Sequence, residues 1–359
     1  MKRVVILCVW LFSVVAGHAQ LSLDECRRLA RENYPEIRQY DLVHQTEQYN
    51  LSNAARAWIP QLAFSAQATW QTDAPNFPKE LTGMLAQQGL EIPGLRKDQY
   101  KVALELNQTI WDGGKSVADK RIARAEAAEQ KTMTDVDLYE LEGRVDDLYF
   151  GILLLDERIA QTNLTLNLLR SNLEKVRALQ RNGVAMQSDA DVLEAELLSV
   201  GQQLIQFESS CDSYRRMLGI FIGQKVGDRK LQRPSAVQPL SGESARPELA
   251  MFAAKIDRLT AQEKMVKSSS MPRLGFFAQG YYGYPGLDYM QSMMNSDWSW
   301  NAMLGVKLSW NFGAYYTQKN NLNKLRTSRQ QVEVQRDVFL FNMNLQAAQE
   351  NGDIARLRK

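Results

Sequence analysis

The feature that most constrains this chain is a strict alternation of three- and four-residue steps between apolar side chains. The stripe consists of Leu138, Leu141, Val145, Leu148, Ile152, Leu155, Ile159, Leu166, Leu169, Leu173 and Val176, with Thr162 as its one polar step. Such spacing keeps a narrow apolar face on one side of a helix and predicts coiled-coil packing. No Pro interrupts residues 115–180. The sequence therefore predicts one helix there, about 100 Å long at 1.5 Å per residue.

A second helix with the same pattern follows a short polar turn. Its apolar steps are Leu193, Leu197, Val200, Leu204, Phe207, Cys211, Tyr214 and Leu218. The two helices are expected to form an antiparallel hairpin whose tip is RNGVAMQSDADVL, residues 181–193. Asn182-Gly183 can take the left-handed conformation that ends a helix, and Ser188 or Asp189 can cap the next one. The turn either only reverses the chain, as local chemistry favours, or also contacts a partner.

Four other segments alternate apolar and polar side chains with a period of two, which predicts β-strands. Their apolar positions are Leu62, Phe64, Ala66, Ala68 and Trp70; Val102, Leu104, Leu106 and Ile110; Leu274, Phe276, Ala278 and Tyr282; and Trp298, Trp300, Ala302, Leu304, Val306, Leu308 and Trp310. Strands of about 10 to 13 residues are long enough to cross a bilayer at a tilt. Aromatic residues at several ends (Trp70, Trp111, Tyr281, Tyr282, Trp298, Trp300 and Trp310) fit the interfacial girdles of a lipid-facing barrel. A soluble sheet with one buried face is the alternative.

Four strands are too few to close a barrel, because about eight are needed even to enclose side chains or one small ligand. An open sheet edge is not tolerated in lipid. The chain is therefore expected to share its barrel with other copies. The polar faces carry Lys101, Glu105, Gln279 and Lys307, which show no dominant charge and do not identify an exported molecule.

An internal repeat relates the N-terminal and C-terminal parts of the chain. Such a repeat constrains the fold more strongly than any local motif. Pro35-Glu36 aligns with Pro247-Glu248, and Pro60-Gln61-Leu62 and Pro272-Arg273-Leu274 follow at the same distance. Each later Pro is expected to end a helix and to open a strand. In both copies, a loop, a second strand and a long helix come next.

These patterns divide the chain into three expected parts. Residues 1–19 form a signal peptide, 20–244 a first structural repeat and 245–359 a second. The first repeat is expected to contain a helix, a β-hairpin at 61–111, a long helical hairpin at 115–218 and an equatorial segment at 219–244. The second is expected to contain a helix, a β-hairpin at 273–312 and a long helix at 315–359 with apolar steps at Val334, Val338, Phe341, Leu345 and Ala348. The connections 71–97 and 283–297 are expected to be loops, in which Asn76-Phe77-Pro78 and Ile92-Pro93-Gly94 are typical of plain turns.

By comparison with the first repeat, the second is expected to be incomplete. Its long helix reaches Lys359 without a second tip or a returning helix. The sequence is therefore expected to be truncated at its C-terminal end.

The N-terminus has the three-part layout of a secretory leader. Met1-Lys2-Arg3 precedes an apolar run at residues 4–16 that is too short to span a bilayer as a helix. Cleavage is expected near Ala19-Gln20. Cys8 lies inside the run, so a lipid-anchored N-terminus is not expected.

No recognisable catalytic or cofactor-binding constellation follows the leader. His44 is the one remaining His, and the chain has no CxxC pair, no Walker loop and no GxSxG elbow; a carboxylate-only pair stays open. Acidic residues lie mostly among Lys and Arg on helical stretches, which is typical of a solvated face. A net charge of +2 indicates no nucleic-acid partner. We expect no enzyme, no cofactor and no metal.

Two Cys remain after the expected cleavage, Cys26 and Cys211. An exported protein could join them in a disulfide. The preferred interpretation is that Cys211, which falls on the helical seam, acts as a small apolar side chain.

Taken together, the patterns resemble the TolC family of outer-membrane efflux proteins over essentially all of residues 21–359. The resemblance rests on the duplicated Pro-Glu and Pro-x-Leu positions, on WDGG at 111–114 and NFGA at 311–314, and on the tip NGVAMQSD at 182–189. It implies a mainly α fold with β structure: long antiparallel coiled-coil helices form a periplasmic α-barrel, and four transmembrane strands per chain contribute to a trimeric twelve-strand barrel in outer-membrane lipid.

The resemblance also implies a function and partners. The homotrimer would be the passive exit duct of a tripartite efflux pump or type I secretion system, joined to a periplasmic membrane-fusion (adaptor) protein and, indirectly, to an inner-membrane transporter. The positions that match the family's adaptor-contacting tip are Arg181, Gly183, Val184, Ala185, Ser188 and Asp189. The alternatives are a periplasmic coiled-coil scaffold or a non-functional truncated relic. A diffusion porin is disfavoured because it closes its barrel with one chain.

The chain departs from the resemblance in one respect, because the second helical tip is absent. In the family that second pair of helices helps to form the closing gate, so no gate residues are named. The resemblance implies that a trimer of this chain would have three long periplasmic helices from each copy and a gap in its tunnel wall. It also implies that the loops 71–97 and 283–297 face outside the cell.

Overall fold

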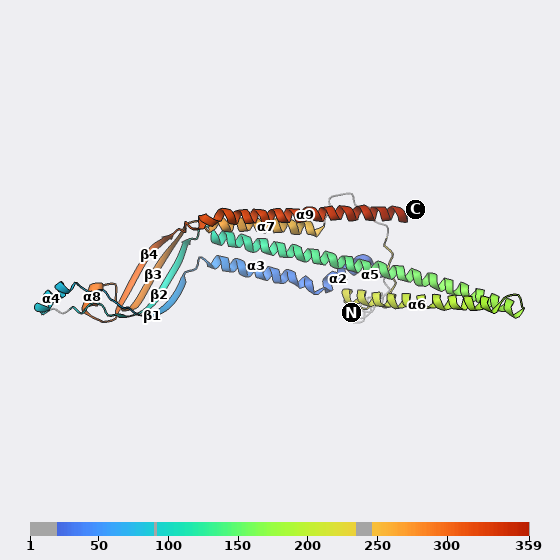
Figure 1. The fold of residues 1–359 in the computed structure, drawn as a ribbon, viewed down its shortest axis with the longest axis horizontal. Helices are drawn as coiled ribbons and strands as arrows, with labels where there is room; N and C mark the ends of the chain where they lie inside the picture. The colour runs from blue at the N-terminus through green and yellow to red at the C-terminus, as the bar shows by residue number, and fades with distance from the viewer. Residues whose placement is uncertain (1–19, 90–91, 235–245, 359) are drawn as a thin grey trace, which may run out of the picture. The chain divides into compact units, whose positions relative to one another are not determined.

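The structure, a computed structural model, describes residues 20–89, 92–234 and 246–358 (Figure 1). The expected signal peptide at 1–19 and part of the expected equatorial segment, 235–245, lie outside the described residues. The elements are α2 (Leu23–Asn33), η1 (Pro35–Arg38), α3 (Gln39–Arg56), β1 (Gln61–Trp70), α4 (Lys79–Gln87), β2 (Asp98–Trp111), α5 (Lys115–Arg181), α6 (Gln187–Ile222), α7 (Pro247–Ser268), β3 (Arg273–Tyr284), α8 (Tyr289–Met294), β4 (Ser299–Ser309) and α9 (Ala314–Leu357).

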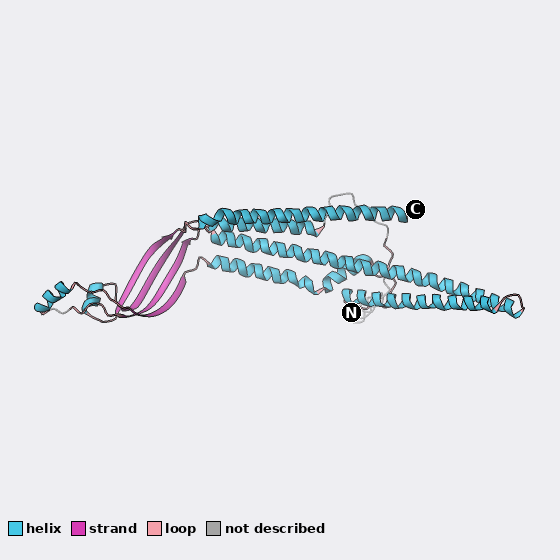
Figure 2. Cartoon of the chain, in the orientation of Figure 1, coloured by secondary structure: helices cyan, strands magenta, loops and turns pink. Residues whose placement is uncertain are grey.

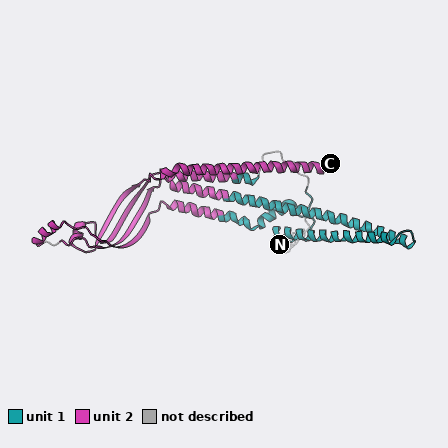
Figure 3. Cartoon of the chain, in the orientation of Figure 1, with its two compact units in different colours: residues 1–42, 130–251 teal, residues 43–129, 252–359 magenta. Residues whose placement is uncertain are grey.

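The fold is mainly helical with one small antiparallel sheet (Figure 2). The chain divides into two compact units (Figure 3). Unit 1 comprises residues 1–42 and 130–251, and unit 2 comprises residues 43–129 and 252–359. None of the described helices is long and apolar enough to cross a membrane.

In unit 1, α5 and α6 form the predicted antiparallel helical hairpin (Figure 1). The seam is confirmed by the burial of Leu138, Leu141, Val145, Leu148, Ile152, Leu166 and Leu173 on α5 and of Val200, Cys211 and Leu218 on α6. Tyr214 is 38% exposed, but its ring contacts the partner helix α5 at Gly151. A ring can pack there because glycine has no side chain in the way.

The core of unit 1 also holds the start of the described chain. Leu21 pairs with Leu231 in a parallel β-bridge. The Tyr149 hydroxyl lies 2.7 Å from the Leu21 carbonyl oxygen and 2.5 Å from that of Gln232. Cys26 and Cys211 are both free and buried in this core. Their burial agrees with the preferred interpretation of Cys211 as a core side chain.

Unit 2 contains the sheet, whose strand order is β1-β2-β3-β4 with every pair antiparallel. The register places the predicted apolar positions on one face. Phe64 lies opposite Leu104, Val102 opposite Tyr282, and Ala278 opposite Leu304. The four predicted strands and their apolar faces are therefore confirmed. A register shift between Thr109 and Trp111 marks a β-bulge where β2 approaches α5.

The two connections at the far end of the sheet differ from the expectation of plain turns. They contain α4 and α8 (Figure 1). Asp288 caps α8, because its side chain accepts a hydrogen bond of 3.0 Å from the Gln291 N–H. Both helices are too short to show a 3.6-residue periodicity over a useful window, which explains why the sequence pattern did not predict them.

The other end of the sheet joins the helices of unit 2. Gly113 turns the chain with φ of 69°, and a Cβ there would lie only 2.7 Å from the Met271 Cβ. Ser270 binds the start of the second long helix, because its carbonyl accepts from Trp310 Nε1 at 3.0 Å and its hydroxyl accepts from Gln318 Nε2 at 2.7 Å. Along α9, the predicted apolar steps Val334, Val338, Phe341 and Leu345 are exposed.

Candidate membrane-embedded wall and partner-binding tip

The apolar face of the sheet is not covered by any described part of the chain. Phe64 is 73% exposed, Leu304 75% and Trp300 82%. Exposing apolar surface to water costs about 25 cal/mol per Å², so a broad face of this kind indicates a lipid or protein partner. The register and the exposure together favour the barrel-wall interpretation over a soluble sheet with one buried face.

Aromatic rings gather at both ends of this face. At the end that leads to α4 and α8, the pairs are Tyr100–Trp298 (5.8 Å between centroids), Tyr282–Trp298 (5.4 Å) and Tyr282–Trp300 (5.0 Å). At the other end, Trp310 and Phe312 lie 4.7 Å apart. Tyr281, predicted among the girdle residues, is buried instead on the polar face, with Lys101 Nζ 4.5 Å from its ring centroid. Two aromatic bands flanking an apolar band are typical of membrane barrels.

The polar face brings three of the four singled-out side chains together. Lys101 Nζ donates a 3.1 Å hydrogen bond to Gln279 Oε1, and Gln279 Nε2 donates to Glu105. Lys307 lies opposite Gly275 and takes no part in this chain of hydrogen bonds. These contacts cross from β2 to β3, so they depend on the strand register.

Each outer strand of the sheet is paired on one side only. Within the described chain, β1 pairs with β2 alone and β4 pairs with β3 alone. Their outer edges present backbone N–H and C=O groups that lipid cannot satisfy. A membrane-embedded sheet of this kind needs further strands at both edges.

Where each hairpin of strands leads into a long helix, a polar residue of the repeat accepts hydrogen bonds from nearby backbone N–H groups. Asp112 accepts hydrogen bonds from the N–H groups of Gly114 at 2.9 Å and Ser116 at 2.7 Å. Burial alone would raise the pKa of Asp112, but the Ser116 hydroxyl and these N–H groups lower it overall. In the second copy, Asn311 accepts from the Gly313 N–H at 3.0 Å. In WDGG, Asp112 thus caps the start of α5, whereas in NFGA the Asn311 side chain stabilises the turn before α9 without capping that helix.

The tip of the helical hairpin ends α5 in a Schellman motif. The Val184 N–H donates to the Leu179 carbonyl at 2.9 Å and the Gly183 N–H to the Gln180 carbonyl at 3.0 Å. Gly183 has φ of 75°, a left-handed conformation that costs glycine little. The predicted role of Asn182-Gly183 in ending the helix is therefore confirmed.

The start of α6 differs in part from the prediction. Met186 is the N-cap residue, and Asp189 accepts a 3.0 Å hydrogen bond from the Met186 N–H. Asp189 thus caps the helix from its third position, whereas Ser188 does not cap it. The Asp189 carboxylate is consequently engaged in a hydrogen bond within the chain.

The tip presents apolar as well as polar side chains. Val184 is 73% exposed and Met186 74%; Arg181 and Ser188 are exposed and Ala185 is half-buried. The prediction did not include Met186, although an apolar residue in a polar turn was a visible signal. The structure thus places the six predicted tip positions at the last residue of α5 (Arg181), in the turn (Gly183, Val184 and Ala185) and in the first turn of α6 (Ser188 and Asp189).

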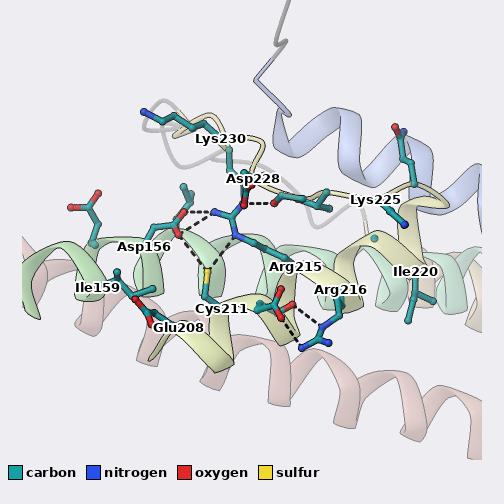
Figure 4. A pocket seen from close by; sticks show the side chains of 18 of the residues that line it. Asp156, Ile159, Glu208, Cys211, Arg215, Arg216, Ile220, Lys225, Asp228 and Lys230 are labelled. Atoms are coloured by element: carbon teal, nitrogen blue, oxygen red, sulfur yellow. Dashed lines mark hydrogen bonds and ion pairs between the residues drawn. The ribbon is translucent and has the colours of Figure 1, made fainter. Parts of the chain in front are cut away.

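A groove of about 1290 Å³ lies between α5, α6 and the segment after α6 in unit 1 (Figure 4). Arg215 spans it. Its guanidinium donates to Asp156 at 2.8 and 3.1 Å, and to the carbonyls of Gly227 at 2.8 Å and Arg229 at 3.1 Å. Cys211 lies beside this pair, and burial raises the pKa of its thiol. These bonds attach the segment to the hairpin, so we assign the Arg215 cluster a structural role.

A family of known proteins matches this chain. The family model described as "Outer membrane efflux protein" matches residues 27–223, which is more than half of the chain. No curated protein sequence matches.

Several solved structures share the fold. The outer membrane protein VceC from Vibrio cholerae matches with a TM-score of 0.64 and 15% identity, covering 89% of this chain and 75% of its own. The outer-membrane channel OprN matches with a TM-score of 0.63 and 14% identity, covering 89% and 71%. The CmeC outer membrane channel of Campylobacter jejuni matches with a TM-score of 0.59 and 15% identity, covering 89% and 68%.

The family model covers more than half of the chain, which assigns the chain to that family, and the observed fold agrees with the assignment. A family member of this architecture resides in the outer membrane, with its long helices in the periplasm. This chain belongs to the outer membrane efflux protein family.

Proposed function

We propose that three copies of this chain form the outer-membrane exit duct of a tripartite efflux pump or type I secretion system. The duct is a passive conduit, not an enzyme. The single observation that carries the proposal is the four-stranded sheet with an exposed apolar face and one unpaired edge on each side. Such a sheet is stable in lipid only when other strands complete it.

Homotrimerisation closes the sheet into a barrel. About eight strands are the minimum for a barrel that holds side chains, and three copies provide twelve. The free edge of β1 in one copy pairs with the free edge of β4 in the next. The apolar face then meets lipid, and the polar face with Lys101, Glu105 and Gln279 lines the lumen.

Cross-linking between copies tests this arrangement. Ser65 on β1 and Met303 on β4 belong to the face that carries Glu105. In outer membranes, Ser65→Cys/Met303→Cys treated with a bismaleimide should give dimers and trimers, and either single variant should give monomers. Native mass spectrometry of the extracted protein should show a trimer. A soluble monomer in the periplasm, with no cross-linked species, would reject the channel and favour a scaffold.

The helical tip is the proposed contact for a periplasmic adaptor, through which the duct reaches an inner-membrane transporter. The adaptor-binding residues are Arg181, Gly183, Val184, Ala185, Ser188 and Asp189. Exposed Val184 and Met186 support a partly apolar contact, and exposed Arg181 and Ser188 supply polar groups. Because the Asp189 carboxylate already accepts from the Met186 N–H, Asp189 also holds the tip in the shape that the adaptor would contact.

A further inference from the structure

We infer that Arg273 and Lys307 make the helix-proximal end of the duct selective for anions, and that this end binds the anionic groups of exported molecules. The inference rests on the proposed channel function, because it requires the polar face of the sheet to line the lumen. It concerns unit 2 alone. Its ligand class is a small molecule with a carboxylate, sulfonate or phosphate group.

The strand register assigns each charged residue to a face. Among the described strands, the polar face carries Lys101, Glu105, Arg273 and Lys307. Arg273 lies opposite Ser309, and Lys307 lies opposite Gly275. The two cations are therefore diagonal neighbours on adjacent strands, a spacing of about 7–8 Å between such positions. The sequence analysis did not include Arg273 among the residues of the polar faces and therefore indicated no dominant charge.

The charges of the polar face are not evenly compensated along the strands. Lys101 and Glu105 are linked through Gln279, so their charges offset each other. Arg273 and Lys307 form no ion pair with any residue that the structure describes. Two cations without a counter-charge remain at the end of the sheet nearest the helices.

A cavity of about 620 Å³ opens beside these two cations, between the polar face and the start of α5. Three carboxylates line it, and each has a partner: Asp119 pairs with Lys115 at 2.9 Å, Asp112 accepts the two capping hydrogen bonds, and Glu105 accepts from Gln279. Asn107 and Gln279 add polar groups to the lining. Within the described chain, Arg273 and Lys307 are thus the two cations of this lining without an ion-pair partner, and together with the neighbouring hydrogen-bonding groups they can hold an anion of small-molecule size.

The field of the pair reaches furthest from the wall when salt is low. The Debye length is about 10 Å at 0.1 M ionic strength and about 3 Å at 1 M. Like charges on the wall of a cleft concentrate the opposite ion. In the trimer, each copy adds the same pair, so the effect of Arg273 and Lys307 is repeated around the wall.

Ion selectivity in planar lipid bilayers tests the inference. The trimer extracted from outer membranes is inserted under a KCl gradient at roughly 0.1 M ionic strength, and the reversal potential gives the Cl⁻/K⁺ permeability ratio. The ratio should exceed one in the unmodified protein. Arg273→Gln/Lys307→Gln should bring it close to one, and Arg273→Glu/Lys307→Glu should bring it below one. The matched control, Arg273→Lys/Lys307→Arg, exchanges the two cations and should preserve the ratio.

A second readout uses an organic anion. Benzenesulfonate added on the side of the helical tips should reduce the conductance of the unmodified channel and of the exchanged control, but not that of the glutamine pair. Conducting pores with a ratio of one or less, or a ratio that the glutamine pair leaves unchanged, would overturn the inference while leaving the channel intact. A trimer that conducts no ions in any variant would instead reject the proposed function and, with it, this inference.

Discussion

The ring of Tyr214 on α6 lies directly over Gly151 on α5. A Cβ built at Gly151 would be 2.7 Å from Tyr214 Cε2 and 2.9 Å from Cδ2. No real side chain tolerates such distances without a shift. The glycine is thus the reason why the ring can lie across the helix at this point of the hairpin.

We predict that Gly151→Ala destabilises the helical hairpin. Overpacking of a close contact costs about 1–3 kcal/mol, whereas the gain in helix propensity is only about 1 kcal/mol. Gly143 on the same helix is the matched control, because a Cβ there meets nothing within 4 Å. Gly143→Ala should raise the free energy of unfolding, measured by denaturant titration in detergent. If both variants gain stability equally, the Tyr214 contact carries no packing constraint.

Alkaline pH should destabilise the core of unit 1. Burial, and secondarily the charge of Glu25, raises the pKa of Cys26 to about 12 from its ordinary value of 9.0. Burial, with a contribution from Cys26, raises the pKa of Tyr149 to about 12 from 10.0. Both groups keep their protons longer when folded, so the unfolded chain binds fewer protons in this range. Their stabilisation is complete below about pH 9 and is lost as pH rises towards 12.

The unfolding midpoint in denaturant, measured between about pH 8 and 11, checks this linkage. The unmodified protein should lose stability more steeply than Cys26→Ser/Tyr149→Phe, which removes both titrations. Equal slopes for the two proteins would show that other groups cause the alkaline loss.

The two faces of β4 should respond oppositely to the same substitution. Leu304→Arg places a cation in the apolar band and should cost about 2–4 kcal/mol near the bilayer midplane. Met303→Arg places the same side chain on the polar face and should be tolerated. Unfolding free energies in lipid vesicles, together with the yield of trimer in outer membranes, compare the two variants. An equal loss at both positions would contradict the assignment of the lipid face.

The helical tip should be needed for export but not for assembly. Val184→Glu puts a charge on an exposed apolar tip side chain, where it would be desolvated in a partly apolar contact. Drug resistance or secretion by cells should fall, while the trimer and its conductance in bilayers remain. Asn163→Glu adds the same charge to an exposed position of α5 well before the tip and should retain export. Full export with Val184→Glu would remove Val184 from the proposed docking surface.

The helical hairpin, the four strands and the apolar side of each strand can be predicted from the spacing of apolar residues alone. These features follow from periods of 3.5 and 2 that local geometry enforces residue by residue. The matching Pro and Gly positions likewise marked where Gln61 and Arg273 begin their strands.

The side-chain contacts between separate segments could not be predicted in this way. The hydrogen bonds from Lys101 to Gln279 and from Gln279 to Glu105 depend on the strand register. The alternating pattern of one strand does not specify which residues of the next strand lie opposite. The same is true of the attachment of Arg215 to the segment after α6 and of the Tyr214 ring over Gly151. Each joins residues from separate segments, and such contacts arise from packing, which no local pattern encodes.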